Sequence, residues 1–253
     1  MARINQSKPM LFIVDTGFGG KLMVDDVIAQ NLELEHLGSR TVNNLGMGNI
    51  VIEDYQGAIF STDDITLTIP KVEAQKKLHL MLNQMGVDKN GNKPVGTISP
   101  WILTKGTLTF NAGLNSITVD DNDHLTPTMP GVIPYSFAAG IPTFKAKVAG
   151  HHFNAHLDTG SPAKLIIPSR FIEQFEFIQE PVARGGAKTV GRTHKLWTAK
   201  IKGSVDLGAV SIDDPDVLFI EGLPAINIGL SAFDGGKVRI DPTNELIEFQ
   251  LKP

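Results

Sequence analysis

The stretch Ala155-His156-Leu157-Asp158-Thr159-Gly160-Ser161-Pro162 places a carboxylate directly after an apolar run, followed by a hydroxyl residue, a glycine and a second hydroxyl. The glycine allows the backbone to turn sharply. The same phrase recurs as Phe12-Ile13-Val14-Asp15-Thr16-Gly17, and the two aspartates are 143 residues apart (158 − 15). One Asp-Thr-Gly is weak evidence, because short tripeptides recur by chance. Two copies in matching contexts indicate a duplicated unit, and we expect a site built from two carboxylates, one from each copy.

Composition narrows the classes of function. The 253-residue chain is long enough for two domains, and a formal charge of −4 gives no large basic field, so we expect no nucleic-acid partner. The absence of cysteine excludes disulfides and thiolate chemistry. No apolar run approaches the roughly 18 residues that a transmembrane helix needs, so we expect no membrane span. We do not expect the first residues, Met1-Ala-Arg-Ile-Asn, to be a signal peptide, because no apolar stretch of suitable length follows them. We expect a periplasmic or secreted location if a leader was removed, and a cytoplasmic one otherwise.

Strand-like segments, separated by glycine, proline and asparagine, dominate the chain and predict an all-β fold with a few short helices. We expect Ala2–Ile4 and Met10–Val14 to pair as a hairpin. Further strands of the first half are expected at Lys21–Val24, within Thr41–Phe60, and at Ile65–Ile69, Gly96–Leu103 and Gly106–Val119.

Two helices are expected in the first half. Asp25 or Asp26 can cap a short helix that continues through Leu34. Apolar residues at helical spacing predict a second helix over Lys71–Met85. An acidic run and four prolines then indicate a connection between two lobes over Asp120–Pro142, with a strand at Val132–Phe137.

The second half repeats the first. Thr143–Val148 and Phe153–Leu157 predict a hairpin over Gly150. After it we expect a strand at Lys164–Pro168, a short helix capped by Ser169 that runs through Phe175 or Phe177, and a strand-turn-strand stretch over Gly185–Lys200. The sequence therefore predicts an N-terminal lobe over residues 1–119, a connection over 120–142 and a C-terminal lobe over 143–253.

The ends of the two lobes also match. Ile226–Phe233 aligns with Gly96–Leu103 when Gly229 is set against Ser99, an offset of 130 residues (229 − 99). The offset at the aspartates is 143, so the first lobe carries about 13 extra residues between these points. The helix expected over Lys71–Met85 accounts for them.

The repeated order of a strand, Asp-Thr-Gly, a strand with a short helix, a glycine-rich hairpin and a hydrophobic-hydrophobic-Gly element resembles the aspartic proteases, the pepsin-like and retropepsin-like clan. That last element is Asn227-Ile228-Gly229 in the second lobe and Thr97-Ile98-Ser99 in the first. The resemblance covers nearly the whole chain. It implies a two-lobed, pepsin-like barrel similar to two retropepsin subunits joined head to tail, as in bacterial aspartyl proteases of this type.

The resemblance implies an aspartic-type endopeptidase in which Asp15 and Asp158 are the catalytic dyad. Two facing carboxyl groups share one proton, because both cannot ionise at low cost. One then acts as general base on a water, and the other donates to the scissile carbonyl. No metal or other cofactor is implied. Both aspartates lie in one chain, so a monomer suffices, and the partner is a peptide or protein substrate in extended conformation.

The resemblance also assigns supporting roles. Thr16 and Thr159 would bond across the pseudo-twofold axis, Gly17 and Gly160 would let amides approach the carboxylates, and Ser161 would bond Asp158. The first flap is expected within Asn43–Gln56 and a second wall within Arg184–Trp197. Candidate substrate-binding residues are Tyr55 and Trp197.

Other interpretations remain. His151, His152 and His156 lack the spacing of metal ligands, and we expect them to be solvated on the hairpin. Phe18 stands where the family has a small or hydroxyl residue, and Ser99 stands where it has glycine. Both departures favour the alternative function, a non-catalytic peptide-binding module that retains the fold.

Overall fold

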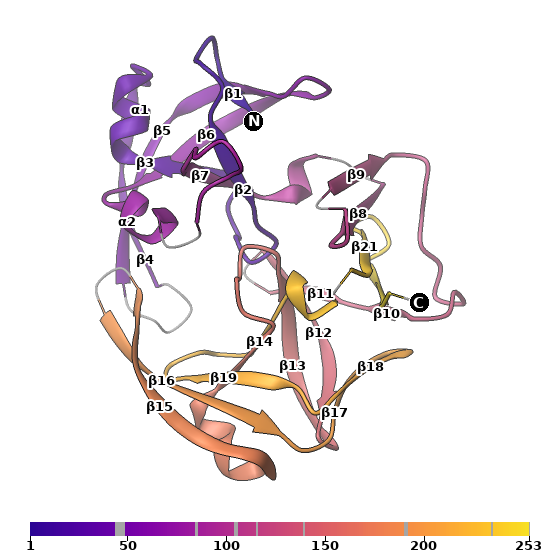
Figure 1. The fold of residues 1–253 in the computed structure, drawn as a ribbon. Coiled ribbons are helices and arrows are strands. Elements are labelled where there is room, and N and C mark those ends of the chain that lie inside the picture. The colour runs from indigo at the N-terminus through magenta and orange to yellow at the C-terminus, as the bar shows by residue number, and fades with distance from the viewer. Residues whose placement is uncertain are drawn as a thin grey trace. The chain divides into compact units, whose positions relative to one another are not determined.

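A computed structural model of the protein describes residues 1–43, 49–83, 86–103, 106–114, 116–138, 140–189, 192–233 and 235–252. Strands dominate and the helices are few and short, which confirms the all-β prediction (Figure 1). The chain divides into two compact units, of which the first comprises Met1–Leu103 with Thr189–Arg192 and the second the remaining residues. The division comes before residue 119, the expected end of the first lobe. The reason is that β8 (Thr107–Asn111) pairs with β21 (Lys237–Asp241) of the second half.

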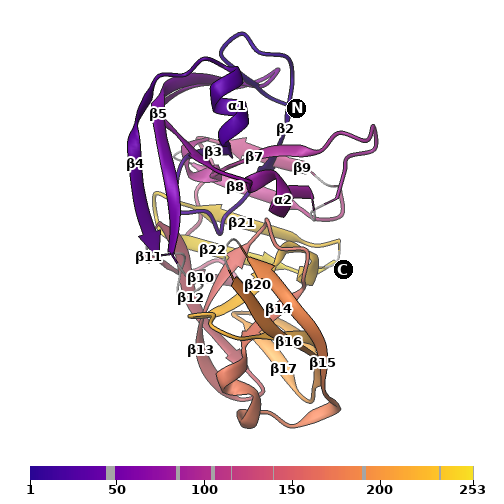
Figure 2. The same ribbon diagram turned by 90° about the vertical axis from the view of Figure 1, so that its left-hand side faces the viewer.

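The first unit is built on one seven-stranded sheet among the described residues, ordered β1-β5-β6-β3-β7-β2 with β4 paired to β5. Its strands are β1 (Arg3–Ile4), β2 (Leu11–Val14), β3 (Leu22–Asp25), β4 (His36–Asn43), β5 (Asn49–Ser61), β6 (Thr66–Gln75) and β7 (Pro94–Ile98), and its helices are α1 (Asp26–Asn31), α2 (Leu78–Leu82) and the 3-10 turn η2 (Pro100–Ile102). Figure 2 shows the antiparallel strands β4 and β5 side by side in this unit. Leu22, Val24, Val72 and Ile98 are buried in its core.

The second unit contains a ten-stranded sheet in the described part of the chain, ordered β15-β16-β19-β14-β20-β13-β12-β17-β18 with β11 paired to β12. The strands are β11 (Ser136–Ala138), β12 (Ile141–Val148), β13 (His151–Asp158), β14 (Leu165–Pro168), β15 (Phe177–Thr189), β16 (Arg192–Ile201), β17 (Ser204–Leu207), β18 (Val210–Asp213), β19 (Asp216–Ile220) and β20 (Ile226–Gly229). Two 3-10 segments, η3 (Ser169–Gln174) and η4 (Leu230–Phe233), follow β14 and β20. Leu157, Ile167, Phe219 and Ile228 are buried here.

A five-stranded sheet completes the second unit, again counting only described residues. Its order is β10-β22-β21-β8-β9. The strands not yet given are β9 (Ser116–Asp120), β10 (Val132–Pro134) and β22 (Leu246–Gln250). Phe110, Phe233 and Phe249 are buried around it, and the rings of Phe233 and Phe249 stack with centroids 5.1 Å apart.

The duplication expected from the sequence is present in the strand registers. The order β2-β7-β3-β6-β5 of the first sheet matches β13-β20-β14-β19-β16 of the second, with the same parallel and antiparallel pairings. Leu22 lies opposite Ile98 as Leu165 lies opposite Ile228. Residue pairs in corresponding strands can therefore be compared one by one.

The helix expected over Lys71–Met85 is wrong. Residues up to Gln75 continue β6, and the only helix described there is α2, five residues long. Val72 and Ala74 are buried while Lys71 and Glu73 face the other side, so the local period is two and not 3.6. The extra residues of the first unit lie between β6 and β7, around α2.

Four smaller expectations change in the structure. Only an isolated bridge from Ala2 to Met10 remains of the N-terminal hairpin, because β1 pairs with β5 and β2 with β7. Asp25 caps α1 through the Val27 amide, but α1 ends before Leu34. The segment after Ser169 is a 3-10 helix without a side-chain cap. The strand expected at Val132–Phe137 is divided between β10 and β11.

None of the helices in the described part of the chain has the length and apolar character that crossing a bilayer requires.

Candidate functional site

The first Asp-Thr-Gly directly follows β2. The Asp15 amide donates to the carbonyl of Ile98 in the parallel neighbour β7 (3.0 Å), which carries the register of the sheet one residue beyond the strand. The Gly17 amide donates to Asp15 Oδ1 at 2.7 Å. Asp15 is half-buried and Thr16 is fully buried. The loop thus fixes Asp15 at two points, because its amide donates to β7 and its carboxylate accepts from the Gly17 amide.

The second Asp-Thr-Gly lies at the end of β13, in the other unit. Asp158 is half-buried and lies opposite Gly229 of β20. Asn227 Nδ2 donates to Asp158 Oδ2, so one carboxylate oxygen is held by a side chain. The Ser161 amide donates to the Asp158 carbonyl at 3.1 Å, whereas the Ser161 hydroxyl pairs with Ala163 within the loop and not with the carboxylate. Thr159 and Gly160 are half-buried.

Each Asp-Thr-Gly loop is hydrogen-bonded to the hydrophobic-hydrophobic-Gly element of its own unit. The Ser99 amide donates to the Lys21 carbonyl and the Gly229 amide to the Lys164 carbonyl, both at 3.0 Å. A Cβ at Gly229 would overlap the carbonyl oxygen of Ala163, so only glycine fits there. The first unit places a buried serine at the same position, and the Ser99 hydroxyl has no hydrogen-bond partner among the described atoms.

The absence of a side chain at Gly20 explains how the loop of the first unit accommodates the bulky Phe18. Gly20 takes the place of Ala163 in the repeat, counted from the aspartates. A Cβ at Gly20 would overlap the Phe18 ring and the Glu73 carboxylate. The bulky Phe18 therefore lies over a residue without a side chain, and the loop keeps its hydrogen bonds.

His156 is buried, which corrects the expectation that the hairpin histidines are solvated; His151 and His152 are exposed. His156 and Asp158 lie two residues apart on one strand and so face the same side. Burial lowers the pKa of His156, and the nearby Asp158 carboxylate opposes this effect. The imidazole is thus favoured in its neutral form.

Tyr55 lies in the core of the first unit and not on an exposed flap. Its side chain is buried, and its hydroxyl donates to Asp26 Oδ1 at 2.7 Å. Burial and this hydrogen bond raise the pKa of Tyr55 to about 12. These contacts give Tyr55 a structural role, so the interpretation as a flap aromatic is not kept. The expected flap within Asn43–Gln56 includes residues 44–48, which lie outside the described residues.

Four charged side chains cover one face of β4, β5 and β6. Arg40 pairs with Asp54 (3.2 Å) and with Glu73, and Lys71 pairs with Asp54 at 3.0 Å. Burial raises the pKa of Glu73, and the two cations only partly offset it. We refer to Arg40, Asp54, Lys71 and Glu73 as the charge network.

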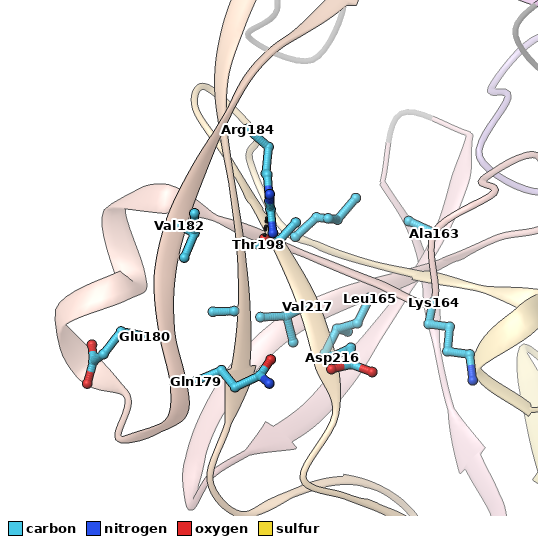
Figure 3. Close-up of a pocket in the computed structure, with 12 residues that line it drawn as sticks. Ala163, Lys164, Leu165, Gln179, Glu180, Val182, Arg184, Thr198, Asp216 and Val217 are labelled. Carbon is cyan, nitrogen blue, oxygen red and sulfur yellow. Dashed lines mark hydrogen bonds between the residues drawn. The ribbon is translucent and has the colours of Figure 1, made fainter.

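The second unit has an open hollow of about 790 Å³. Its lining comes from β14 to β16 and β19, and includes Leu165, Gln179, Arg184, Thr198, Asp216 and Leu218 (Figure 3). Arg184 Nε donates to Thr198 Oγ1 at 3.1 Å. Trp197 neighbours Thr198 in β16 and is half-buried, but it does not line the hollow.

Sequence reasoning missed the hollow, the charge network and the hydrogen bond from Asn227 to Asp158, because all three depend on which strands become neighbours. The alternation of Lys71 and Glu73 with buried residues was the available signal. Comparison with protein-family models and with curated protein sequences gives no match for this chain. Its function is therefore inferred from its own residues.

Proposed function

We propose that the protein is an aspartic endopeptidase of the pepsin-like and retropepsin-like kind, with Asp15 and Asp158 as one catalytic dyad. The observation that carries the proposal is the position of the two aspartates. Asp15 directly follows β2 and Asp158 ends β13, two strands that hold the same place in the repeat, and each strand pairs in parallel with the strand that carries the matching element.

The proposed chemistry uses a water bound between the two carboxyl groups. The ionised carboxylate takes a proton from this water, which attacks the scissile carbonyl, while the protonated carboxyl donates to the carbonyl oxygen. The carboxyl that took the water's proton then gives it to the amide nitrogen, while the other carboxylate takes a proton from a hydroxyl of the tetrahedral intermediate; the C–N bond breaks, the amine leaves, and the dyad again holds one proton. The backbone and side-chain donors at Asp15 Oδ1 and Asp158 Oδ2 support this role, because they fix the orientation of each carboxylate.

Thr16, Thr159 and the glycines after them keep their proposed supporting roles. A substrate would bind in extended conformation, with its backbone paired to strand edges and its side chains in hollows. The hollow of the second unit is one such space. Both aspartates come from one chain, so the proposed active form is a monomer.

The test measures cleavage of an unstructured protein between pH 4 and pH 7 by Asp15→Asn and Asp158→Asn, each against the unchanged protein. Each variant should lose at least about 10³-fold in kcat/KM, because neither aspartate replaces the other. Asp63→Asn, which removes an exposed carboxylate from the β5–β6 turn, is the matched control and should cleave normally. Retained cleavage in either dyad variant would rule out the shared dyad.

A second candidate is a peptide-binding module without turnover. Phe18 and the unpaired Ser99 hydroxyl favour it, since both change the surroundings of Asp15. Peptide capture without cleavage, insensitive to a statine-type transition-state mimic, would select this candidate. Cleavage that the mimic inhibits would exclude it.

A further inference from the structure

The hollow of the second unit has a filled counterpart in the first. In the first sheet Met23, Glu73 and Asp54 lie in one row across β3, β6 and β5. The corresponding row of the second sheet is Ile166, Leu218 and Thr198 across β14, β19 and β16. Two residues before Glu73 and Leu218 stand Lys71 and Asp216. The charge network therefore covers the face of β5 and β6 that corresponds to the face of β16 and β19 beside the hollow.

The open hollow combines apolar walls with one unpaired carboxylate. Leu218 of β19 and Val182 of β15 contribute accessible apolar surface, whereas Leu165 and Val217 are almost fully buried. Within the described part of the chain, no hydrogen bond or ion pair is found for the Asp216 carboxylate, whose side chain is exposed to the hollow. Figure 3 shows Gln179 and Asp216 pointing toward one another across one end of it.

The other charged groups at the rim do not satisfy Asp216. Arg184 comes in from the opposite end and is held by the Thr198 hydroxyl. The ammonium of Lys164 and the carboxylate of Glu180 point away from the space between Gln179 and Asp216. Lys200 lies opposite Asp216 across β16 and β19, but no ion pair joins the two in the described part of the chain. The end of the hollow at Asp216 therefore offers an unpaired carboxylate and an amide oxygen.

We propose that this hollow binds a lysine or arginine side chain of an extended peptide. The methylene stem packs against Leu218, which lies on the same face of β19 as Asp216, and the cation bonds Asp216 and the Gln179 amide oxygen. That the ligand is a peptide rests on the proposed function. The first unit illustrates the chemistry, because there Lys71 and Arg40 of the chain itself supply the cations to neighbouring carboxylates. An acidic side chain would meet the Asp216 carboxylate and be repelled.

The experiment uses the full chain and eight-residue peptides that differ at a single position, which carries lysine, norleucine or glutamate and is moved along the peptide. Norleucine keeps the stem of lysine and removes its charge. At one position lysine should exceed norleucine by about tenfold in kcat/KM, with glutamate lowest. Asp216→Asn should remove this difference, and Asp63→Asn should preserve it.

A charge-reversal variant separates loss of the binding site from loss of the fold. Asp216→Lys should move the preference to glutamate at the same position, which damage to the fold cannot produce. If the unchanged protein cleaves the peptides with no preference for lysine, or if Asp216→Asn keeps that preference, the basic side-chain site is wrong and the aspartic dyad still stands.

If the unchanged protein cleaves none of the peptides, the proposed catalysis fails and the same peptides are measured for binding by fluorescence anisotropy. A lysine peptide bound about tenfold more tightly than its norleucine counterpart, with the difference lost in Asp216→Asn, supports the site without catalysis. Equal affinities for the lysine and norleucine peptides would overturn it.

Discussion

The loops after Asp15 and Asp158 accept the same backbone hydrogen bond, from Ser99 to the Lys21 carbonyl and from Gly229 to the Lys164 carbonyl, but they distribute side-chain volume in opposite ways. In the second unit Gly229 has no side chain and Ala163 lies against it; in the first, Ser99 carries a side chain and Gly20 replaces the alanine. The amide-to-carbonyl bonds beneath both loops are equal, at 3.0 Å. The two units therefore share the backbone hydrogen bond. They differ in where side-chain volume lies, on the loop in the second unit and on the strand end in the first.

The largest expected effect comes from moving the first unit's serine into the second. Gly229→Ser should destabilise the second unit by about 3 kcal/mol, because the new Cβ meets the carbonyl oxygen of Ala163, a backbone atom that cannot turn aside. The measurement is urea unfolding followed by Trp197 fluorescence in a Trp101→Phe background, since the chain has two tryptophans, one in each unit.

The reciprocal change is the control. Ser99→Gly removes a buried hydroxyl without a partner, so its cost should stay below about 1 kcal/mol. Here the reporter is Trp101 in a Trp197→Phe background. A Gly229→Ser protein as stable as its parent would show that the second loop relaxes as freely as the first.

The charge network should give the next largest effect. Arg40→Met keeps much of the side-chain stem and leaves Glu73 with Lys71 alone, at 4.0 Å, so the first unit should lose about 2 kcal/mol in urea unfolding at pH 7. Arg184→Met, whose partner is the neutral Thr198, is the matched control in the second unit and should cost about 0.5 kcal/mol. Equal losses would mean that the network adds nothing to the fold.

His156 should make the second unit sensitive to mild acid. Its pKa is lowered in the folded state, so the unfolded chain binds a proton first, and stability falls as the pH drops below the ordinary value of 6.5. Between pH 7 and pH 5 the loss should be about 1 kcal/mol. His156→Ile, which copies Ile13 of the first unit, should remove this component of the slope. If the unfolding free energy of His156→Ile depends on pH as it does in the unchanged protein, other groups cause the acid sensitivity.

Asp25 should give the smallest effect, in the first unit. The His79 amide and imidazole and the Val27 amide outweigh burial and lower the pKa of Asp25, so the stability it contributes is complete above its ordinary pKa of 3.8. That contribution is lost as the pH falls through the lower folded-state pKa. Asp25→Asn should reduce the acid sensitivity of Trp101-monitored unfolding by about 0.5 kcal/mol. Pro168 stands at the equivalent position of the second unit, where no such titration is expected.

The sequence predicted those parts of the fold that depend on local alternation and on the repeat. The hairpin ending at Asp158 and the strand before Asp15 follow from apolar runs bounded by glycine. The helix prediction over Lys71–Met85 was wrong because the spacing of Val72, Leu78 and Leu82 also fits a helix. The segment up to Gln75 is a strand because it pairs with β5 and β3.

Of the candidate site, the sequence predicted only the two Asp-Thr-Gly motifs. Asp15 and Asp158 are fixed by their tripeptides, whereas Asn227 reaches Asp158 because two strands 69 residues apart (227 − 158) become parallel neighbours. Tyr55 was misjudged for the same reason: its partner Asp26 comes from another part of the chain. Long-range pairing of this kind leaves no signal in a single sequence.

The most direct measurement of the central claim is a comparison of Asp15→Asn, Asp158→Asn and the variant that carries both changes, with kcat/KM determined on one peptide. If the two carboxyl groups act as one dyad, each single variant loses nearly all cleavage, and the double variant loses no more than either. Losses that multiply in the double variant, or a single variant that still cleaves, would contradict the shared site.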